Sequence, residues 1–125
     1  MILADTSVWV DHLRHGDAQL VALLERASIL MHPLIVGEVA CASLKNRKTV
    51  LALLQGMPSA VIAEHDEVLT FVERCRLWGK GIGYIDMHLL AAVALTHGAT
   101  LWTRDKRLRS VSQELGQAHM ENGAA

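Results

Sequence analysis

Four acidic residues lie at points of the chain where strands and helices would meet: Asp5, Glu38, Asp86 and Asp105. Asp5 ends the short apolar run 2–4, and Asp105 follows the apolar segment 100–103 by two residues. Glu38 falls one turn into one expected helix, and Asp86 begins another. Ligands of an open parallel sheet gather beyond the carboxyl ends of its strands. We therefore expect the four carboxylates to meet in one crevice.

A cluster of carboxylates needs a cation or protons to be stable. Two unit charges about 4 Å apart repel by roughly 4 kcal/mol at an effective dielectric constant of 20. An all-oxygen site without a thiolate or imidazole favours Mg²⁺ or Mn²⁺, and such ions promote phosphodiester hydrolysis. Thr6, Ser7 and Thr103 are the hydroxyls expected to orient these carboxylates.

Helix capping is the alternative for three of these acids. Asp5, Asp86 and Asp105 all lie where acids commonly cap helices, and the chain has 13 acidic residues. Glu38 differs, because it lies inside the apolar run PLIVGEVACA, where an unpaired carboxylate would be costly. Glu38 is therefore the acid that most requires a function.

The chain as a whole has the size of one domain, and we expect residues 1–125 to form it. Its composition is 51% hydrophobic, but charged residues interrupt every apolar run that could span a membrane. The N-terminus lacks the basic stretch of a secretory signal. We expect a cytoplasmic protein whose surplus apolar surface meets a partner or a second copy. Cys41 and Cys75 lack CxxC spacing and are expected to be reduced core thiols.

Short apolar runs alternate with amphipathic segments along the chain. Strands are expected at 2–4, 28–31, 60–63, 100–103 and 118–120. After an initial helix that Asp5 could cap, helices are expected near 18–27, 33–44, 46–55, 66–77, 86–97 and 106–115. The tail 121–125 is expected to be frayed. Alternating strands and helices indicate parallel βαβ units, so the fold class is α/β with helices on both faces of the sheet.

Basic residues gather beside the last acid. The run RDKRLR supplies Arg104, Lys106, Arg107 and Arg109, which could contact RNA phosphates although the net charge of the chain is -1. A solvated helix face is an equal alternative for each. His88 follows Asp86 by two residues, which places it about 200° away around a helix, so it is not expected to share a metal with Asp86.

Four segments carry a resemblance to a known family: DTSVWVDHLR, LIVGEVA, GIGYIDMHLLAAVAL and GATLWTRDKRL. In this order and spacing they resemble the PIN-domain ribonucleases, and among these the VapC toxins of bacterial toxin–antitoxin pairs. The resemblance covers essentially the whole chain. It departs at Lys106-Arg107-Leu108, where relatives often carry another acid and an aromatic residue.

The resemblance implies a three-layer α/β/α domain around a short, mostly parallel five-stranded sheet. It implies an endoribonuclease that depends on Mg²⁺ or Mn²⁺, with Asp5, Glu38, Asp86 and Asp105 as metal-binding, catalytic acids. Thr103 matches the hydroxyl residue that usually accompanies the fourth acid. Transfer or ribosomal RNA would be the substrate, and translation would be inhibited. A VapB-like antitoxin and a homodimer are the implied partners.

Other families with acids at strand ends fit less well. A receiver-like domain would need two adjacent acids after the first strand, and a haloacid-dehalogenase-type phosphatase would need D-x-D, whereas this chain has Asp5-Thr6-Ser7. A catalytically silent PIN-like domain that only binds RNA or antitoxin is the remaining alternative.

Overall fold

Three short strands form a parallel sheet at the centre of the computed structural model, which describes residues 1–121. The strands are β1 (Ile2–Ala4), β2 (Ile29–Leu30) and β3 (Thr100–Trp102), in the order β2-β1-β3. Ile2 of β1 pairs with Ile29 on one side and with Thr100 on the other. The central strand is covered on both faces, which explains why it is a continuous apolar run.

The prediction of five strands is wrong for the described residues, which form three. In place of the strands expected at 60–63 and 118–120 there are two isolated bridges: Met31 pairs with Ser59, just before the first segment, and Leu101 pairs with Ala118. After Ala60 donates to the Met31 carbonyl, the next amide, Val61, turns to the side-chain oxygen of Thr96. The outer ladder therefore stops after one bridge.

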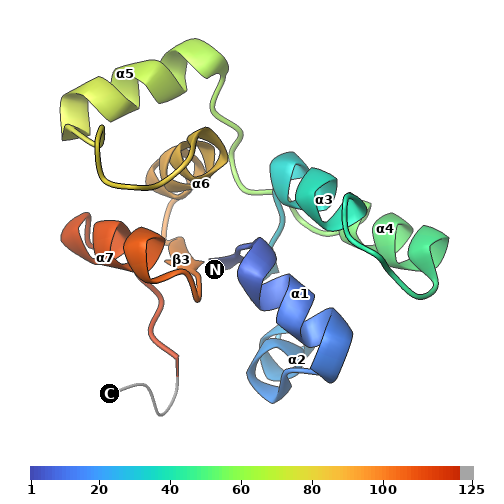
Figure 1. Cartoon of the computed structure of the whole chain (residues 1–125). Coiled ribbons are helices and arrows are strands. Elements are labelled where there is room, and N and C mark those ends of the chain that lie inside the picture. Colours follow the sequence, from blue (N-terminus) through green and yellow to red (C-terminus); the bar gives the residue numbers. More distant parts are fainter. Residues whose placement is uncertain (122–125) are drawn as a thin grey trace.

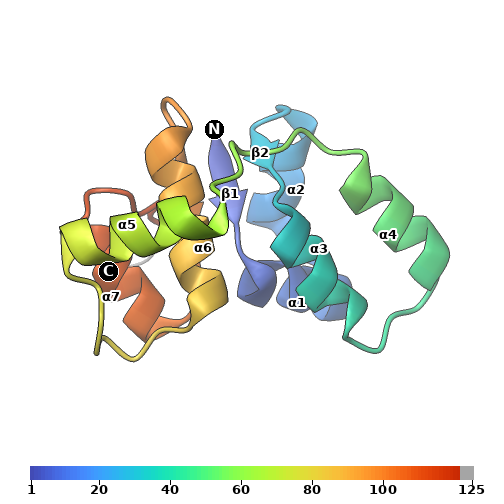
Figure 2. The same ribbon diagram turned by 90° about the horizontal axis from the view of Figure 1, so that it is seen from above.

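Seven helices are present in the described part of the chain. Their bounds are α1 (Thr6–His15), α2 (Ala18–Glu25), α3 (Pro33–Ala40), α4 (Arg47–Gln55), α5 (His65–Cys75), α6 (Tyr84–Leu95) and α7 (Lys106–Glu114). The first four lie on one side of the sheet and α5 to α7 on the other (Figures 1 and 2). This arrangement confirms the α/β fold class with helices on both faces.

Two helix starts differ from the prediction. The helix expected from Asp66 begins at His65 with Glu64 as its N-cap, and the helix expected from Asp86 begins at Tyr84 with Gly83 as its N-cap. In each case the acid that looked like a cap lies within the first turn, where a carboxylate still stabilises the helix dipole.

The hydrophobic core is formed by the sheet and by the helices that pack against it. Leu3 of β1 and Trp102 of β3 are fully buried, as are Leu90 and Ala92 of α6. Because α6 is buried over most of its length, the orientation of its first turn is fixed by packing. No helix among residues 1–121 has the length and apolar character to cross a membrane.

Candidate active site

Asp5 directly follows β1 and caps α1, and the residue is only 6% exposed. Oδ1 accepts hydrogen bonds from the Ser7 amide at 3.0 Å, the Val8 amide at 3.4 Å and the Ser7 hydroxyl. Oδ2 accepts one from the Thr103 hydroxyl. Burial raises the pKa of Asp5, while these hydrogen bonds act in the opposite direction. The carboxylate is thus held in one orientation at the strand end.

Thr103 connects Asp5 with the fourth acid. Its hydroxyl donates to Asp5 and accepts a hydrogen bond from the amide of Asp105 at 3.1 Å. Asp105 is exposed and caps α7, since its Oδ1 accepts from the Leu108 amide at 2.8 Å. The pairing of β1 with β3 therefore brings residues 100 positions apart to the same edge, as the sequence predicted.

Glu38 of α3 is half-buried and paired. The hydroxyl of Thr6 donates to its Oε1 at 2.6 Å. This hydrogen bond offsets the desolvation cost of a carboxylate within the apolar helix PLIVGEVA. It also places Glu38 beside the residue that directly follows Asp5.

Asp86 lies in the first turn of α6, where its Oδ2 accepts from the Gly83 amide at 3.0 Å. The pKa of Asp86 is raised, first by burial and then by the negative charges of Glu38 and Asp105. Three helices thus deliver carboxylates that influence one another electrostatically. The capping alternative is confirmed for Asp5 and Asp105, and Asp86 also bonds its helix start, so capping and a shared site coexist.

The chemistry of these donors fits a hard divalent cation. All four residues offer oxygen, and a cation would offset both the cost of burying the Asp86 carboxylate and the charges of Glu38 and Asp105 that act on it. In their present orientations the side chains of residues 1–121 place no three His, Cys, Asp or Glu groups so that they could hold one metal ion. The carboxylates instead satisfy the hydrogen bonds described above.

Arg104, the first of the predicted RNA-contacting residues, is engaged within the protein. Its guanidinium bonds Asp11 at 2.8 Å, Glu121 at 2.7 Å and Asp17. It also lies 5.5 Å from the centre of the Trp102 ring. These contacts favour a structural role for Arg104, and they show that Glu121, expected in a frayed tail, is anchored. The rest of that expected tail, 122–125, lies outside the described residues.

The other three basic residues differ in their contacts and exposure. Arg109 donates from Nε and Nη2 to the Thr103 carbonyl at 3.4 and 3.3 Å. Arg107 is exposed and lies against Gly81, where a Cβ would come within 2.9 Å of its side chain. Lys106 is exposed in the first turn of α7, next to Asp105. Lys106 and Arg107 are therefore the better placed for an external anion.

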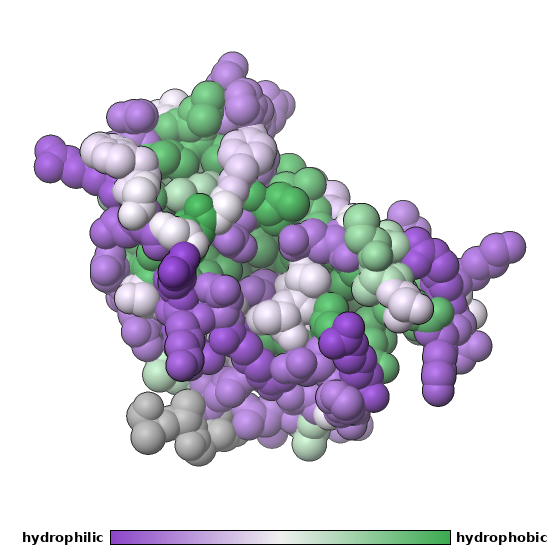
Figure 3. All heavy atoms as spheres, in the orientation of Figure 1, coloured by the Kyte–Doolittle hydropathy of each residue, from purple (hydrophilic) through white to green (hydrophobic). Residues whose placement is uncertain are grey.

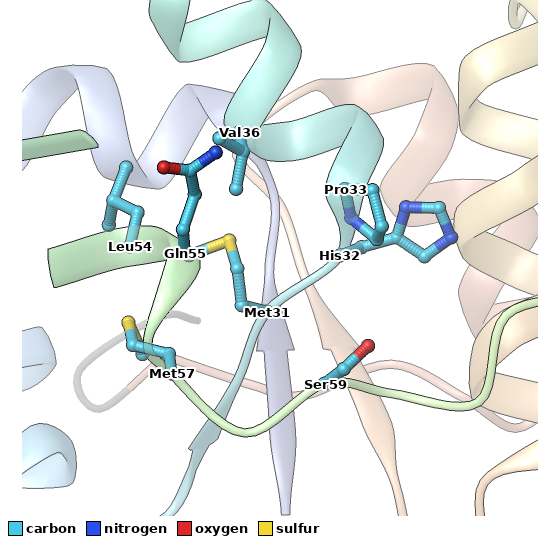
Figure 4. A pocket seen from close by; sticks show the side chains of 8 residues that line it. All are labelled: Met31, His32, Pro33, Val36, Leu54, Gln55, Met57 and Ser59. Atoms are coloured by element: carbon cyan, nitrogen blue, oxygen red, sulfur yellow. The ribbon is translucent and has the colours of Figure 1, made fainter. Parts of the chain in front are cut away.

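A separate cavity of about 340 Å³ lies beside α3 and α4 (Figure 4). Its lining residues come from the end of β2, from α3 and α4, and from the chain after α4: Met31, His32, Pro33, Val36, Leu54, Gln55, Met57 and Ser59. The His32 ring points away from Met31 and Leu54 in this view. None of the four predicted acids lines this cavity, so it is distinct from the acid site.

Sequence reasoning missed one group beside the acids. His65, Tyr84 and His88 form ring contacts between the first turns of α5 and α6. Tyr84 lies two residues before Asp86, and this proximity was the available signal. The partner ring from α5 could not be read from the sequence, because it is 19 residues away from Tyr84.

The chain is similar to known proteins over nearly its whole length. The family model described as "PIN domain" matches residues 2–114. The chain is 51% identical over 121 residues to "Ribonuclease VapC32" from Mycobacterium tuberculosis, in strains CDC 1551 / Oshkosh and ATCC 25618 / H37Rv. The match covers 97% of this chain and 98% of each relative.

Proposed function

Since this chain belongs to the PIN-domain family and is a VapC-type endoribonuclease, we propose that Asp5, Glu38, Asp86 and Asp105 form its catalytic pocket. The observation that carries this proposal is the position of the Thr103 hydroxyl, which donates to the Asp5 carboxylate and accepts from the Asp105 amide, while the charges of Glu38 and Asp105 act on Asp86. Thr103 adds Asp5 to the group through its bond to the carboxylate. The four acids that the sequence singled out thus belong to one local network.

PIN-domain ribonucleases generally depend on divalent metals, and we propose Mg²⁺ or Mn²⁺ as the ion. The four carboxylates would hold it, and when bound it supplies a Lewis acid that offsets the negative charge of the scissile phosphate. Ser7 and Thr103 keep Asp5 fixed during the reaction, and Thr6 does the same for Glu38. Asp5 and Asp86, whose pKa values are both raised by burial, are the carboxylates suited to accept a proton from the attacking water.

Lys106 and Arg107 extend the pocket toward the RNA backbone. Both are exposed at the start of α7, immediately after Asp105. They can pair with phosphates on either side of the cut bond. We propose that transfer or ribosomal RNA is the substrate, because cleavage of either would inhibit translation.

A VapC-type protein has a VapB-like antitoxin as its partner. We propose in addition that the chain forms a homodimer and acts in the cytoplasm. Support for the dimer comes from apolar side chains left on the α5–α6 side, among them Val61, Ile62 and Leu95, which are 48%, 52% and 48% exposed.

Cleavage of total RNA by the purified, antitoxin-free chain tests the catalytic proposal. Parallel reactions contain Mg²⁺, Mn²⁺ or EDTA, and the Asp86→Asn variant is compared with Glu25→Gln, which removes an exposed carboxylate at the end of α2. We expect discrete, metal-dependent cleavage by the wild type and Glu25→Gln, and none by Asp86→Asn. Cleavage that survives both EDTA and Asp86→Asn would overturn the four-acid mechanism.

A catalytically silent domain is the alternative, and no observation favours it. All four acids are retained in the chain. A folded wild type that binds RNA but cuts no RNA pool with either metal would support that alternative.

A further inference from the structure

Four ring side chains form a continuous row: one comes from α5, two from α6 and one from the N-cap of α3. The Tyr84 ring meets the His88 ring at a centroid distance of 4.6 Å and an angle of 87°, and His65 lies 5.6 Å from Tyr84 on another side. The Tyr84 hydroxyl is hydrogen-bonded to His65 Nδ1. Behind them, His88 contacts His32, the N-cap of α3, at 6.4 Å.

The row runs from the core to the surface. His32 is 1% exposed, whereas Tyr84 is 46% exposed. Tyr84 is therefore held by ring contacts and a hydroxyl bond while nearly half of its surface stays in contact with solvent. Such contacts fix the ring orientation before any ligand arrives, and this lowers the entropic cost of stacking on it.

Tyr84 shares the first turn of α6 with Asp86. Residues 84 and 88 lie on one side of the helix because they are four positions apart, and Asp86 lies between them on the opposite side. The start of α6 is at the end of the sheet where β1 leads into α1 (Figure 2). An RNA strand that passes over the N-terminal end of α6 would meet Tyr84 on one side of the helix and Asp86 on the other.

The surface around this position suits an extended ligand. Figure 3 shows the molecule hollowed between the half that carries α5 and α6 and the half that carries α3 and α4, with apolar side chains along the hollow. Single-stranded RNA is bound by splaying bases onto aromatic rings while phosphates contact basic residues. Tyr84 lies on one side of Asp86, and Arg107 and Lys106 belong to the neighbouring α7.

We propose that the Tyr84 ring stacks on one nucleobase of the bound RNA, within two nucleotides of the cut bond. His65 is a positioning residue that holds the tyrosine hydroxyl. The inference rests on the proposed function, since it takes RNA as the ligand of the acid site. It adds a contact to a base, whereas the acids and the basic residues act on the phosphates.

Binding measured without cleavage tests this inference separately from catalysis. Fluorescence anisotropy in EDTA would follow an eight-nucleotide oligoadenylate and a strand of the same length with the same phosphates but no bases. Stacking on one base corresponds to about 5- to 150-fold in affinity. We expect Tyr84→Ala to weaken binding of oligoadenylate about tenfold and to leave binding of the base-free strand unchanged.

Three further variants make the outcome specific. Tyr84→Phe keeps the ring and should retain affinity within about threefold. Leu69→Ala removes another side chain that is 46% exposed and should change neither affinity. Lys106→Ala should weaken binding of both strands to the same degree, because it acts on phosphates.

Two results would overturn the inference. One is a folded Tyr84→Ala variant, shown by an unchanged melting curve, that binds oligoadenylate as tightly as the wild type does. The other is an equal loss for both strands. A variant that binds RNA normally but loses self-association or antitoxin binding would identify Tyr84 as a protein contact instead.

Discussion

The hydroxyl of Thr6, the first residue of α1, donates a hydrogen bond of 2.6 Å to Oε1 of Glu38 on α3. The two residues are 32 positions apart in sequence. The bond gives a half-buried carboxylate a partner and fixes its orientation beside Asp5. It therefore links the stability of the α1–α3 packing to the geometry of the acid site.

Removal of the Thr6 hydroxyl should release the Glu38 carboxylate from its fixed orientation in the acid site. Thr6→Val keeps the shape of the side chain but leaves the carboxylate without its donor. We expect the turnover rate to fall about tenfold and the free energy of unfolding to fall by about 1 kcal/mol. RNA cleavage rates and urea titrations measure the two effects. Thr6→Ser, which keeps the donor, should restore both, and equal loss in Thr6→Ser would contradict the role of the hydroxyl.

Asp86→Asn should stabilise the metal-free protein while it abolishes cleavage. Burial and the charges of Glu38 and Asp105 raise the pKa of Asp86, so the ionised carboxylate is disfavoured in the folded state at neutral pH. Asparagine retains an acceptor for the Gly83 amide. In EDTA we expect the free energy of unfolding of Asp86→Asn to exceed that of the wild type by roughly 1 kcal/mol.

Thermal melts with and without Mg²⁺ check this prediction. Mg²⁺ should raise the melting temperature of the wild type and not that of Asp86→Asn. Asp66→Asn changes an acid in the first turn of α5 and should not stabilise the protein. Lower stability of Asp86→Asn in EDTA would show that burial of the charge and repulsion by the neighbouring acids do not outweigh the hydrogen bond that the carboxylate accepts from Gly83.

Arg104→Ala should destabilise the fold well beyond an ordinary surface change. The variant leaves the carboxylates of Asp11, Asp17 and Glu121 without their shared partner. Because the Arg104 side chain is only 24% exposed, we expect a loss of about 2 to 3 kcal/mol. Lys80→Ala breaks the exposed pair with Glu114 and should cost less than about 1 kcal/mol. Urea titrations of both variants provide the test, and equal small losses would refute the structural role.

Protonation of His32 should limit stability at acidic pH. Burial, together with His88, lowers the pKa of His32 from 6.5 to about 4. Because the folded-state pKa lies below the unfolded one, the folded state binds fewer protons between these values. The stabilisation is complete above pH 6.5 and is lost as the pH falls toward 4, by about 3 kcal/mol in total.

His32→Asn isolates this effect. Asparagine cannot titrate but can still cap α3, where His32 Nδ1 now accepts from the Leu34 amide at 3.1 Å. The unfolding free energy of the variant should fall less steeply than that of the wild type between pH 6.5 and pH 4. His15→Asn, at an exposed histidine, should follow the wild-type slope. If the unfolding free energies of all three proteins change equally with pH, His32 is not the titrating group.

The sequence by itself determined the central strands and the acids at their ends. Ile2–Ala4 is apolar without alternation, as a parallel strand covered on both faces requires, and Asp5 follows it directly. The same reasoning placed Glu38, Asp86 and Asp105 toward one edge of the sheet. Strand direction was sufficient for Asp5 and Asp105, which follow β1 and β3, whereas Glu38 and Asp86 lie within helices and depend also on how α3 and α6 pack.

Only the tertiary structure decided which side chains meet. The bond between Thr6 and Glu38, the three carboxylates around Arg104 and the contact of Tyr84 with His65 each join segments far apart in sequence. The edge segments at Ser59 and Ala118 likewise depend on one bridge each with a neighbouring strand. Hydrophobic periodicity fixes which face of an element is buried, but the pairing of polar and aromatic groups depends on how the packed elements are finally oriented.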